Sequence, residues 1–187
     1  VDNQDAFLDT HELEKARGIT IFSKQAQLAV KDLDITLLDT PGHVDFSAEM
    51  ERTLQVLDYG ILVINGADGV QGHTRTLWKL LKNYRIPVFL FINKMDQAKA
   101  DKTLLLRQLR EKLHENCIDF TEDEAERMEN LATCDEAAMD EYLEKGFLPK
   151  ESIERLIGSP RAFPCYFGSA LKLERVDALL EGLRQYA

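Results

Sequence analysis

A carboxylate, a glycine and a histidine follow one another closely in the stretch Asp39-Thr40-Pro41-Gly42-His43. The stretch comes directly after the apolar run 35–38, which predicts a short strand. A carboxylate at a strand end suits Mg²⁺, which prefers oxygen ligands and keeps several waters. Gly42 lets the backbone approach a phosphate closely, and His43 then stands where an attacking water needs orienting. The alternative is an ordinary tight turn, so the rest of the chain has to decide.

A second polar stretch, Asn93-Lys94-Met95-Asp96, follows the apolar run 87–92. Guanine presents two adjacent donors, and the Asp96 carboxylate can accept both, whereas adenine would leave that carboxylate unpaired. Lys94 can lay its alkyl stem along the plane of a base. Asn93 can either tie neighbouring loops together or bond the edge of the base. Such a tetrapeptide alone is most often a surface turn, so its position carries the argument.

The apolar pattern predicts a sheet that brings these stretches to one edge. Strands are expected at 24–30 (an edge strand), 35–38, 60–64, 87–92 and 162–167, with helices between them and at the end of the chain. Continuous apolar strands alternating with helices predict an α/β fold with a mostly parallel sheet and helices on both faces. Ligands of such sheets bind beyond the carboxyl ends of the strands. The last strand is followed by Gly168-Ser169-Ala170-Leu171, where the Ala170 N–H could meet the guanine carbonyl.

Length and composition predict one globular domain with an insertion. The chain has 187 residues, of which 44% are hydrophobic, and no apolar run reaches the length of a membrane span. The three cysteines form no Cys-x-x-Cys pair, so neither a disulfide framework nor a zinc site is expected. A reducing, cytoplasmic setting fits best.

The acidic charge is concentrated in one segment, residues 117–160. This segment holds 13 Asp and Glu against 4 Lys and Arg, a net charge of −9, while the whole chain carries −10. Such a segment repels nucleic acid and suits a protein partner. The alternative is a solvated helical face without a partner.

Four stretches together resemble the second to fifth guanine-nucleotide motifs of the translational GTPases, in the group of elongation factor G, release factor three and the tetracycline ribosomal-protection proteins. The stretches are Arg17-Gly18-Ile19-Thr20-Ile21, residues 39–46, residues 93–96 and residues 168–171. The resemblance covers essentially the whole chain and implies a three-layer G domain of the P-loop NTPase type. Residues 68–71 and 74–77, together with Gln97, favour the ribosomal-protection branch over elongation factor G.

The resemblance implies GTP or GDP with Mg²⁺ as cofactors and a role for each site residue. Thr20 and Asp39 would bind the metal, the backbone N–H groups of Thr20 and Gly42 would sense the γ-phosphate, and His43 would position the hydrolytic water as the catalytic residue. Guanine would be held by Asn93, Lys94, Asp96, Ser169, Ala170 and Leu171. The implied partner is the ribosome, through ribosomal RNA and stalk proteins that dock on the insertion at 117–160, with neither DNA nor a membrane involved. The oligomeric state is left open.

No Gly-x-x-x-x-Gly-Lys-Ser/Thr motif occurs in the 187 residues. That loop supplies a backbone cradle for phosphates, a lysine and a magnesium hydroxyl. The resemblance therefore implies that residues 1–187 are a GTP-binding domain without its first strand and phosphate loop, beginning inside the first switch. We expect a ribosome-dependent GTPase in the intact parent and a weak or inactive isolated chain. The alternative is a pseudo-GTPase, a protein-interaction module without turnover.

Overall fold

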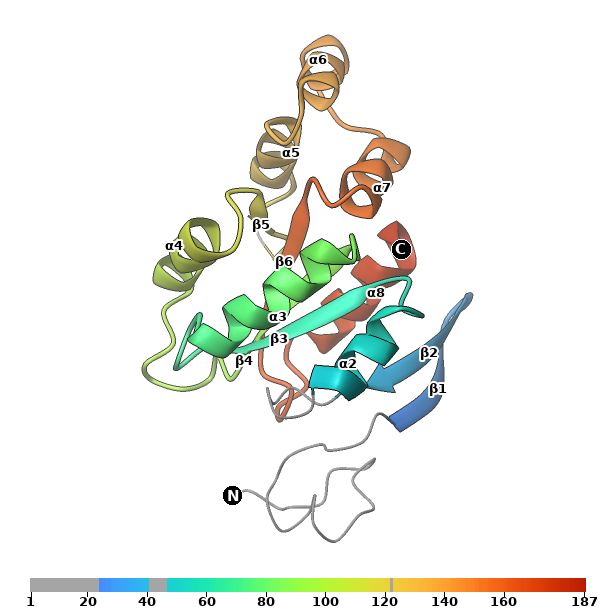
Figure 1. Cartoon of the computed structure of the whole chain (residues 1–187). Helices are drawn as coiled ribbons and strands as arrows, with labels where there is room; N and C mark the ends of the chain where they lie inside the picture. Colours follow the sequence, from blue (N-terminus) through green and yellow to red (C-terminus); the bar gives the residue numbers. More distant parts are fainter. Residues whose placement is uncertain (1–23, 41–46, 122) are drawn as a thin grey trace, which may run out of the picture. The chain divides into compact units, whose positions relative to one another are not determined.

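The computed structural model describes residues 24–40, 47–121 and 123–187 (Figure 1). The chain divides into two compact units, residues 1–57 and 58–187. Its described strands form a two-stranded sheet and a four-stranded sheet.

The first unit contains a β-hairpin and a helix. Strands β1 (Lys24–Val30) and β2 (Leu33–Asp39) pair antiparallel, from Lys24 opposite Asp39 to Val30 opposite Leu33. Lys31 makes the tight turn with a left-handed φ of 56°. The predicted strand 35–38 is therefore confirmed within β2, but its described neighbour is the antiparallel β1. Helix α2 (Ser47–Leu54) buries Met50 and Leu54.

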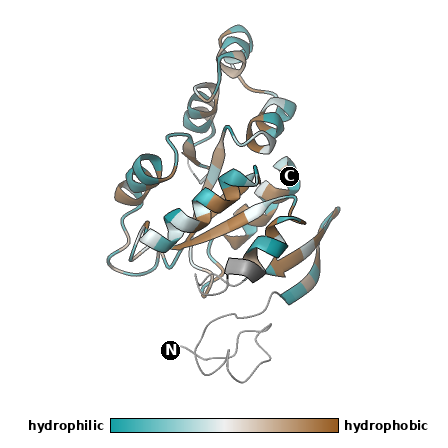
Figure 2. Cartoon of the chain, in the orientation of Figure 1, coloured by the Kyte–Doolittle hydropathy of each residue, from teal (hydrophilic) through white to brown (hydrophobic). Residues whose placement is uncertain are grey.

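The second unit is built on a parallel sheet in the order β3 (Gly60–Asn65), β4 (Val88–Asn93), β6 (Phe163–Phe167) and β5 (Cys117–Asp119). Strand β4 is almost completely buried, with Phe89, Leu90 and Ile92 at 0% exposure. Burial of residues 88–92, odd and even positions alike, means that both faces of the sheet are covered. The predicted parallel α/β sheet is confirmed, and Figure 2 shows its strands as the most hydrophobic part of the unit.

Helices cover this sheet on both sides. In Figure 1, α3 (Gly72–Asn83) crosses in front of the sheet and α8 (Val176–Tyr186) runs behind it, with α4 (Lys102–Lys112) at one side. Trp78 on α3 meets the ring of Phe163 at 4.7 Å between centroids. The buried residues of α3 are Trp78 and Leu81.

The acidic segment 117–160 begins with β5 and continues as three helices, α5 (Glu124–Ala132), α6 (Glu136–Lys145) and α7 (Lys150–Gly158). They lie together at one end of the unit (Figure 1). Leu131, Ile153 and Leu156 are buried in a hydrophobic cluster that also contains Phe91 of β4, so the segment shares the core of the sheet. Two acids cap helices, since Asp123 accepts a hydrogen bond from Ala125 N at 2.9 Å and Asp135 from Ala138 N at 2.8 Å.

Candidate guanine-nucleotide site

The carboxyl ends of three parallel strands lie in register at one edge of the sheet. Asn65 at the end of β3 stands opposite Asn93 at the end of β4, and Ile92 stands opposite Phe167 at the end of β6. The segments that follow, 66–69, 94–96 and 168–171, therefore leave the sheet side by side. This confirms the expectation that the polar residues after these strands gather at one place, where parallel sheets bind ligands.

Asn93 joins two of these segments. Its Oδ1 accepts hydrogen bonds from the backbone N–H of Lys94 at 2.8 Å and of Ala170 at 2.9 Å. A backbone bond from Met95 N to Gly168 O at 3.0 Å supports the same junction. Of the two roles considered for Asn93, the geometry assigns the tying of neighbouring loops. The Ala170 N–H, expected at the guanine carbonyl, is directed to Asn93 here.

Asp96 lies beside two residues of the loop after β6. Ser169, which is 1% exposed, hydrogen-bonds to its side chain, and Lys172 Nζ lies 3.4 Å from Asp96 Oδ2. The hydrogen bond from Ser169 lowers the pKa of Asp96 most, and Lys172 lowers it further. The carboxylate is therefore held in the ionised form that can accept the two donors of guanine. The structure thus brings together Asp96 and Ser169, which are 73 positions apart in the sequence.

The lowered pKa of Asp96 predicts a pH dependence to which Lys172 contributes. In the folded chain the carboxylate stays ionised below the usual titration range of aspartate, so the stabilising contacts it makes are lost only as pH falls through the lowered pKa. In Lys172→Ala the pKa of Asp96 should rise toward the ordinary value and remain below it, because Ser169 stays. Carboxyl NMR titration of the nucleotide-free chain measures both values. Lys99→Ala, which removes an exposed lysine nearby, is the control, and an unchanged pKa in Lys172→Ala would contradict the assignment.

The loop after β6 has a shape that its glycine makes possible. A Cβ on Gly168 would lie 2.2 Å from the carbonyl oxygen of Glu174, so no other residue fits without moving the backbone. Ser169 and Glu174 exchange two backbone hydrogen bonds that close the loop, at 3.1 and 2.9 Å. Leu171 projects from it with 87% of its surface exposed. An apolar side chain so exposed at this edge is available to cover the face of a flat ligand.

Lys94 adopts a left-handed backbone conformation, with φ at 62°, and its side chain is exposed. A residue other than glycine in this region carries a small strain that surrounding contacts must maintain, and such strain clusters at ligand sites. Here the bond from Lys94 N to Asn93 Oδ1 maintains it. The exposed lysine stem is free to lie along a base, as the sequence predicts.

The metal and phosphate residues are only partly within the described chain. Asp39 ends β2 and is half-buried, as expected of a carboxylate delivered by a strand end. Thr20, Gly42 and His43 lie outside the described residues. Their predicted roles stay predictions.

Sequence reasoning missed two lysines that support the site. Lys172 directly follows the 168–171 stretch, and its position beside Asp96 could be inferred only from the folded loop. Lys102, at the start of α4, forms an ion pair with Asp119 at 2.5 Å and lies 5.6 Å from the ring centroid of Phe167. It thereby joins the root of the acidic segment to the strand that carries the 168–171 loop. No local pattern marks Lys102, because its partners are distant in the sequence.

The parallel sheet, the aligned strand ends and the Asn93–Ala170 and Asp96–Ser169 pairs define a domain of the guanine-nucleotide-binding class. The family described as "Elongation factor Tu GTP binding domain" matches residues 1–187, and the chain belongs to this family. A crystal structure of a protein from Thermus thermophilus superposes with a TM-score of 0.85 at 19% identity, over 99% of this chain and 35% of that one. That likeness confirms the fold.

Two curated relatives also match the chain over almost its whole length. The chain is 36% identical over 211 residues to an oxytetracycline resistance protein of Streptomyces rimosus, covering 99% of the chain and 32% of that protein. It is 33% identical over 237 residues to a mitochondrial elongation factor G of Anopheles gambiae, covering 99% of the chain and 32% of that protein. The chain thus spans about a third of the length of these relatives.

Proposed function

We propose that the chain is the GTP-binding and GTP-hydrolysing domain of a translation factor that acts on the ribosome. The observation that carries the proposal is the cluster at the sheet edge, where Asp96 is held ionised by Ser169 while Asn93 fixes Ala170 beside it. A protein that only scaffolds a partner has no use for a carboxylate presented in this way. Membership of the GTP-binding family supports the same conclusion.

Recognition of guanine follows from the chemistry of these side chains. The Asp96 carboxylate accepts hydrogen bonds from the ring N–H and the exocyclic amine of the base, displacing Lys172 as it does so. Leu171 covers one face of the base, and the stem of Lys94 lies along the plane. Adenine lacks the two adjacent donors, so Asp96 would lose water and gain no partner. Ser169 positions Asp96, and Ala170 closes the loop through Asn93.

For the phosphate end we propose the assignments that the resemblance implies. Asp39 suits Mg²⁺, because one carboxylate together with waters and phosphate oxygens satisfies the coordination that this ion prefers. Thr20 would add a hydroxyl ligand, and the N–H groups of Thr20 and Gly42 would meet the γ-phosphate. His43 would hold the attacking water. Bound Mg²⁺ would supply neutralisation of the phosphate charge during hydrolysis.

We also propose that residues 1–187 are a GTP-binding domain lacking its first strand and phosphate loop, with 117–160 as an insertion within it. The 187 residues contain no phosphate-loop motif, so phosphate contributes little to binding here. The isolated chain should then bind guanine nucleotides weakly, select them over adenine nucleotides, and turn over GTP slowly or not at all.

Calorimetric titration of GDP with Mg²⁺ into the 187-residue chain, with ADP as the control, tests the proposed function. Binding of GDP without binding of ADP would confirm a formed guanine site. Binding of neither nucleotide would favour the alternative of an interaction module, as would equal binding of both. Hydrolysis of GTP at the rate of an intact family member would contradict the inferred contribution of the phosphate loop.

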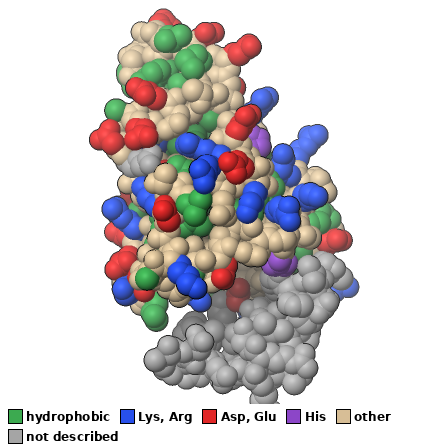
Figure 3. Space-filling model, turned by 90° about the vertical axis from the view of Figure 1, so that its left-hand side faces the viewer, with side chains coloured by type: hydrophobic (Ala, Val, Ile, Leu, Met, Phe, Trp, Pro, Cys, Tyr) green, Lys and Arg blue, Asp and Glu red, His purple; other side chains and the backbone are tan. Residues whose placement is uncertain are grey.

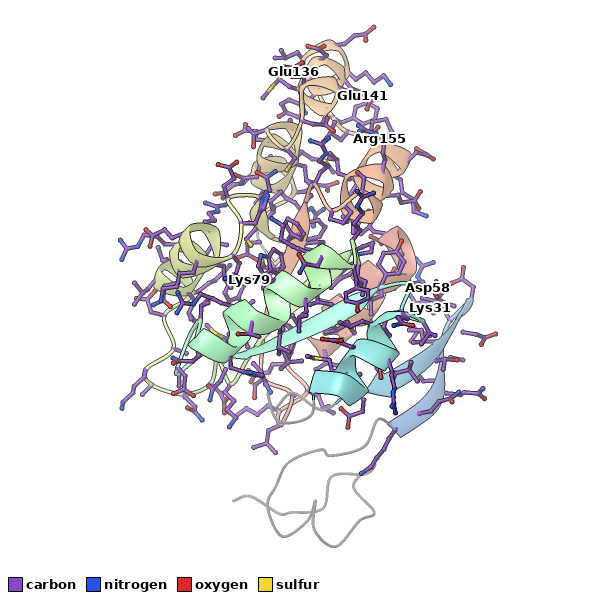
Figure 4. The ribbon with its side chains drawn as sticks, in the orientation of Figure 1. Lys31, Asp58, Lys79, Glu136, Glu141 and Arg155 are labelled. Atoms are coloured by element: carbon purple, nitrogen blue, oxygen red, sulfur yellow. The ribbon has the colours of Figure 1, made fainter. Side chains whose placement is uncertain are left out.

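The proposed partner on the acidic side is a ribosomal stalk protein that docks on α6. Glu136, Asp140 and Glu144 are exposed on this helix, and two large apolar side chains, Leu143 and Phe147, are 74% and 55% exposed at its end. Large exposed apolar side chains on the same helix as exposed charges favour a protein interface over a purely solvated face. Figure 4 shows Glu136 at the far end of the unit from the sheet.

Reversing the charges of Glu136, Asp140 and Glu144 to lysine should reduce ribosome-stimulated GTP hydrolysis by the intact parent several-fold, mainly through slower association. Stopped-flow association with ribosomes measures the effect, which should weaken as salt rises. Glu141 is left unchanged, because it accepts hydrogen bonds from Lys145 at 2.6 Å and from Ser152, and so holds α6 to α7. Reversal of Asp58, Glu111 and Glu115, which are exposed outside the acidic segment, is the matched control. Equal association rates in the two variants would mean that the acidic segment is a solvated face without a partner.

The branch and the location are also proposals. We place the parent closer to the ribosomal-protection proteins than to elongation factor G, on the signatures at 68–71 and 74–77, and in the cytoplasm. Within the described residues, no helix has the length and apolar character needed to cross a membrane.

A further inference from the structure

Three cations form a stripe along one face of α3. Arg75, Lys79 and Lys82 recur at i, i+4 and i+7, which is the spacing of a single helix face. All three are exposed, and none forms an ion pair or side-chain hydrogen bond with another residue of the described chain. Helix α3 contains no Asp or Glu at all. We call these three residues the α3 stripe.

The α3 stripe is expected to lower the stability of the folded protein. Like charges at i, i+4 destabilise a helix, and Arg75 stands near the N-terminus of α3, where the helix dipole disfavours a cation. The positive potential also acts on a neighbour, since the pKa of His114 is lowered first by burial and then by the charge of Lys82. A hydrogen bond of 3.1 Å from Trp78 Nε1 to Leu113 O joins α3 to the end of α4 at this point. An unneutralised stripe of this kind indicates a binding surface.

Charge is distributed unevenly between the part of the unit around the α3 stripe and the acidic segment. Residues 72–115 contain ten Lys and Arg against four Asp and Glu, whereas 117–160 carry a net charge of −9. Figure 3, which looks at the side of the unit at the left of Figure 1, shows many Lys and Arg across its middle, with some Asp and Glu among them, and mostly Asp and Glu at the end formed by the acidic segment. Figure 4 shows Lys79 on α3 beside the sheet and Glu136 at the far tip of the acidic segment. A polyanion would therefore be attracted to the α3 stripe and repelled from the acidic end.

The chemistry of the α3 stripe fits phosphates better than an acidic protein. No residue within α3 is among the large exposed hydrophobic residues, and a protein interface needs an apolar centre. The three cations span about 10 Å along the helix axis. Double-stranded DNA carries about one phosphate per 3.4 Å of axis on each strand, so three successive phosphates span about 7 Å, within reach of three long, flexible side chains spread over about 10 Å.

We propose that the α3 stripe binds the phosphate backbone of a nucleic-acid duplex, with Arg75, Lys79 and Lys82 each meeting one phosphate. Because such contacts carry no sequence information, the surface fixes position and orientation and does not read bases. The inference goes beyond nucleotide binding and does not depend on it. The assignment of the duplex as RNA rests on the proposed function, a protein that acts on the ribosome.

The test measures binding of the 187-residue chain, without nucleotide, to a labelled RNA duplex of about 20 base pairs by fluorescence anisotropy at several salt concentrations. The variant replaces Arg75, Lys79 and Lys82 with glutamine. The control replaces three exposed lysines elsewhere with glutamine, Lys31, Lys99 and Lys150, so that both variants have the same net charge. Circular dichroism checks that all three proteins are folded.

We expect the stripe variant to lose at least about tenfold in affinity at low salt and the slope of log K against log salt to fall by about three. The control should keep the slope of the unsubstituted chain. A DNA duplex of the same sequence distinguishes the sources of phosphate, and the RNA assignment requires that it bind no more tightly than RNA. The proposal is overturned if the chain does not bind RNA, or if both variants lose affinity for RNA equally. It is also overturned if poly-glutamate binds at the stripe and RNA does not.

Discussion

Asp96→Asn should change the preferred base of the chain from guanine to xanthine. Xanthine carries an oxygen where guanine carries the exocyclic amine, so an amide that accepts from the ring N–H and donates to that oxygen complements it. A charged acceptor is lost for guanine at the same time, and we expect GDP affinity to fall about ten- to a hundredfold, with a gain of similar size for xanthosine diphosphate. Calorimetric or NMR-detected titration of the 187-residue chain with both nucleotides measures the exchange.

The matched control is Asp68→Asn, which alters another carboxylate at the same edge of the sheet. Asp68 accepts a hydrogen bond from Asn65 Nδ2 at 2.6 Å and has no proposed contact with the base. This variant should keep the original order of affinities. If Asp96→Asn keeps its affinity for GDP, or loses both nucleotides while remaining folded, Asp96 does not read the base.

Lys102→Ala should lower the free energy of unfolding more than the other two single lysine substitutions, Lys172→Ala and Lys99→Ala. The Asp119 side chain is 0% exposed and depends on Lys102, since its other oxygen already accepts from Thr121 N at 2.7 Å and Oγ1 at 2.6 Å. Removing the lysine leaves a buried charge without its counterion. We expect a loss of about 3 kcal/mol in the free energy of unfolding, at the lower end of the range for such changes, because Lys102 is 39% exposed and water can enter.

Urea denaturation of the purified chain measures this loss. Lys99→Ala, in the loop before α4, should change the free energy of unfolding by less than about 0.5 kcal/mol. The double variant Lys102→Met, Asp119→Asn removes both charges together and should recover most of the loss. If the double variant is no more stable than Lys102→Ala, the buried charge is not the cause.

The sheet and its ligand edge are largely readable from the sequence, because they depend on local pattern. The unbroken apolar run that became β4 predicts a strand covered on both faces, and 0% exposure at Phe89 and Leu90 confirms it. Parallel strands necessarily place their carboxyl ends at one edge, which is why the stretches after β4 and β6 could be expected to meet. Strand β5 was not predicted, because its three residues, Cys117–Asp119, are too few to show a period.

Local sequence pattern does not determine which strands pair with one another. The run 35–38 has the composition of a buried parallel strand, yet its described neighbour is the antiparallel β1, because a tight turn at Lys31 brings the two strands together. The charge pattern marked residues 117–160 as an acidic insertion but did not predict how many helices it contains. The insertion proved to hold three, with Asp123 and Asp135 serving as caps.

By itself, the sequence determined the class of fold, the order of the strand-end motifs and the family, since these depend on which residue types follow one another along the chain. The tertiary structure alone decided which partners those residues take. Asn93 tying Ala170, Lys172 beside Asp96 and Lys102 paired with the buried Asp119 are contacts between residues distant in the sequence. The physical reason is that a side chain's partner is set by strand register and loop shape, and these are fixed only when the whole core packs.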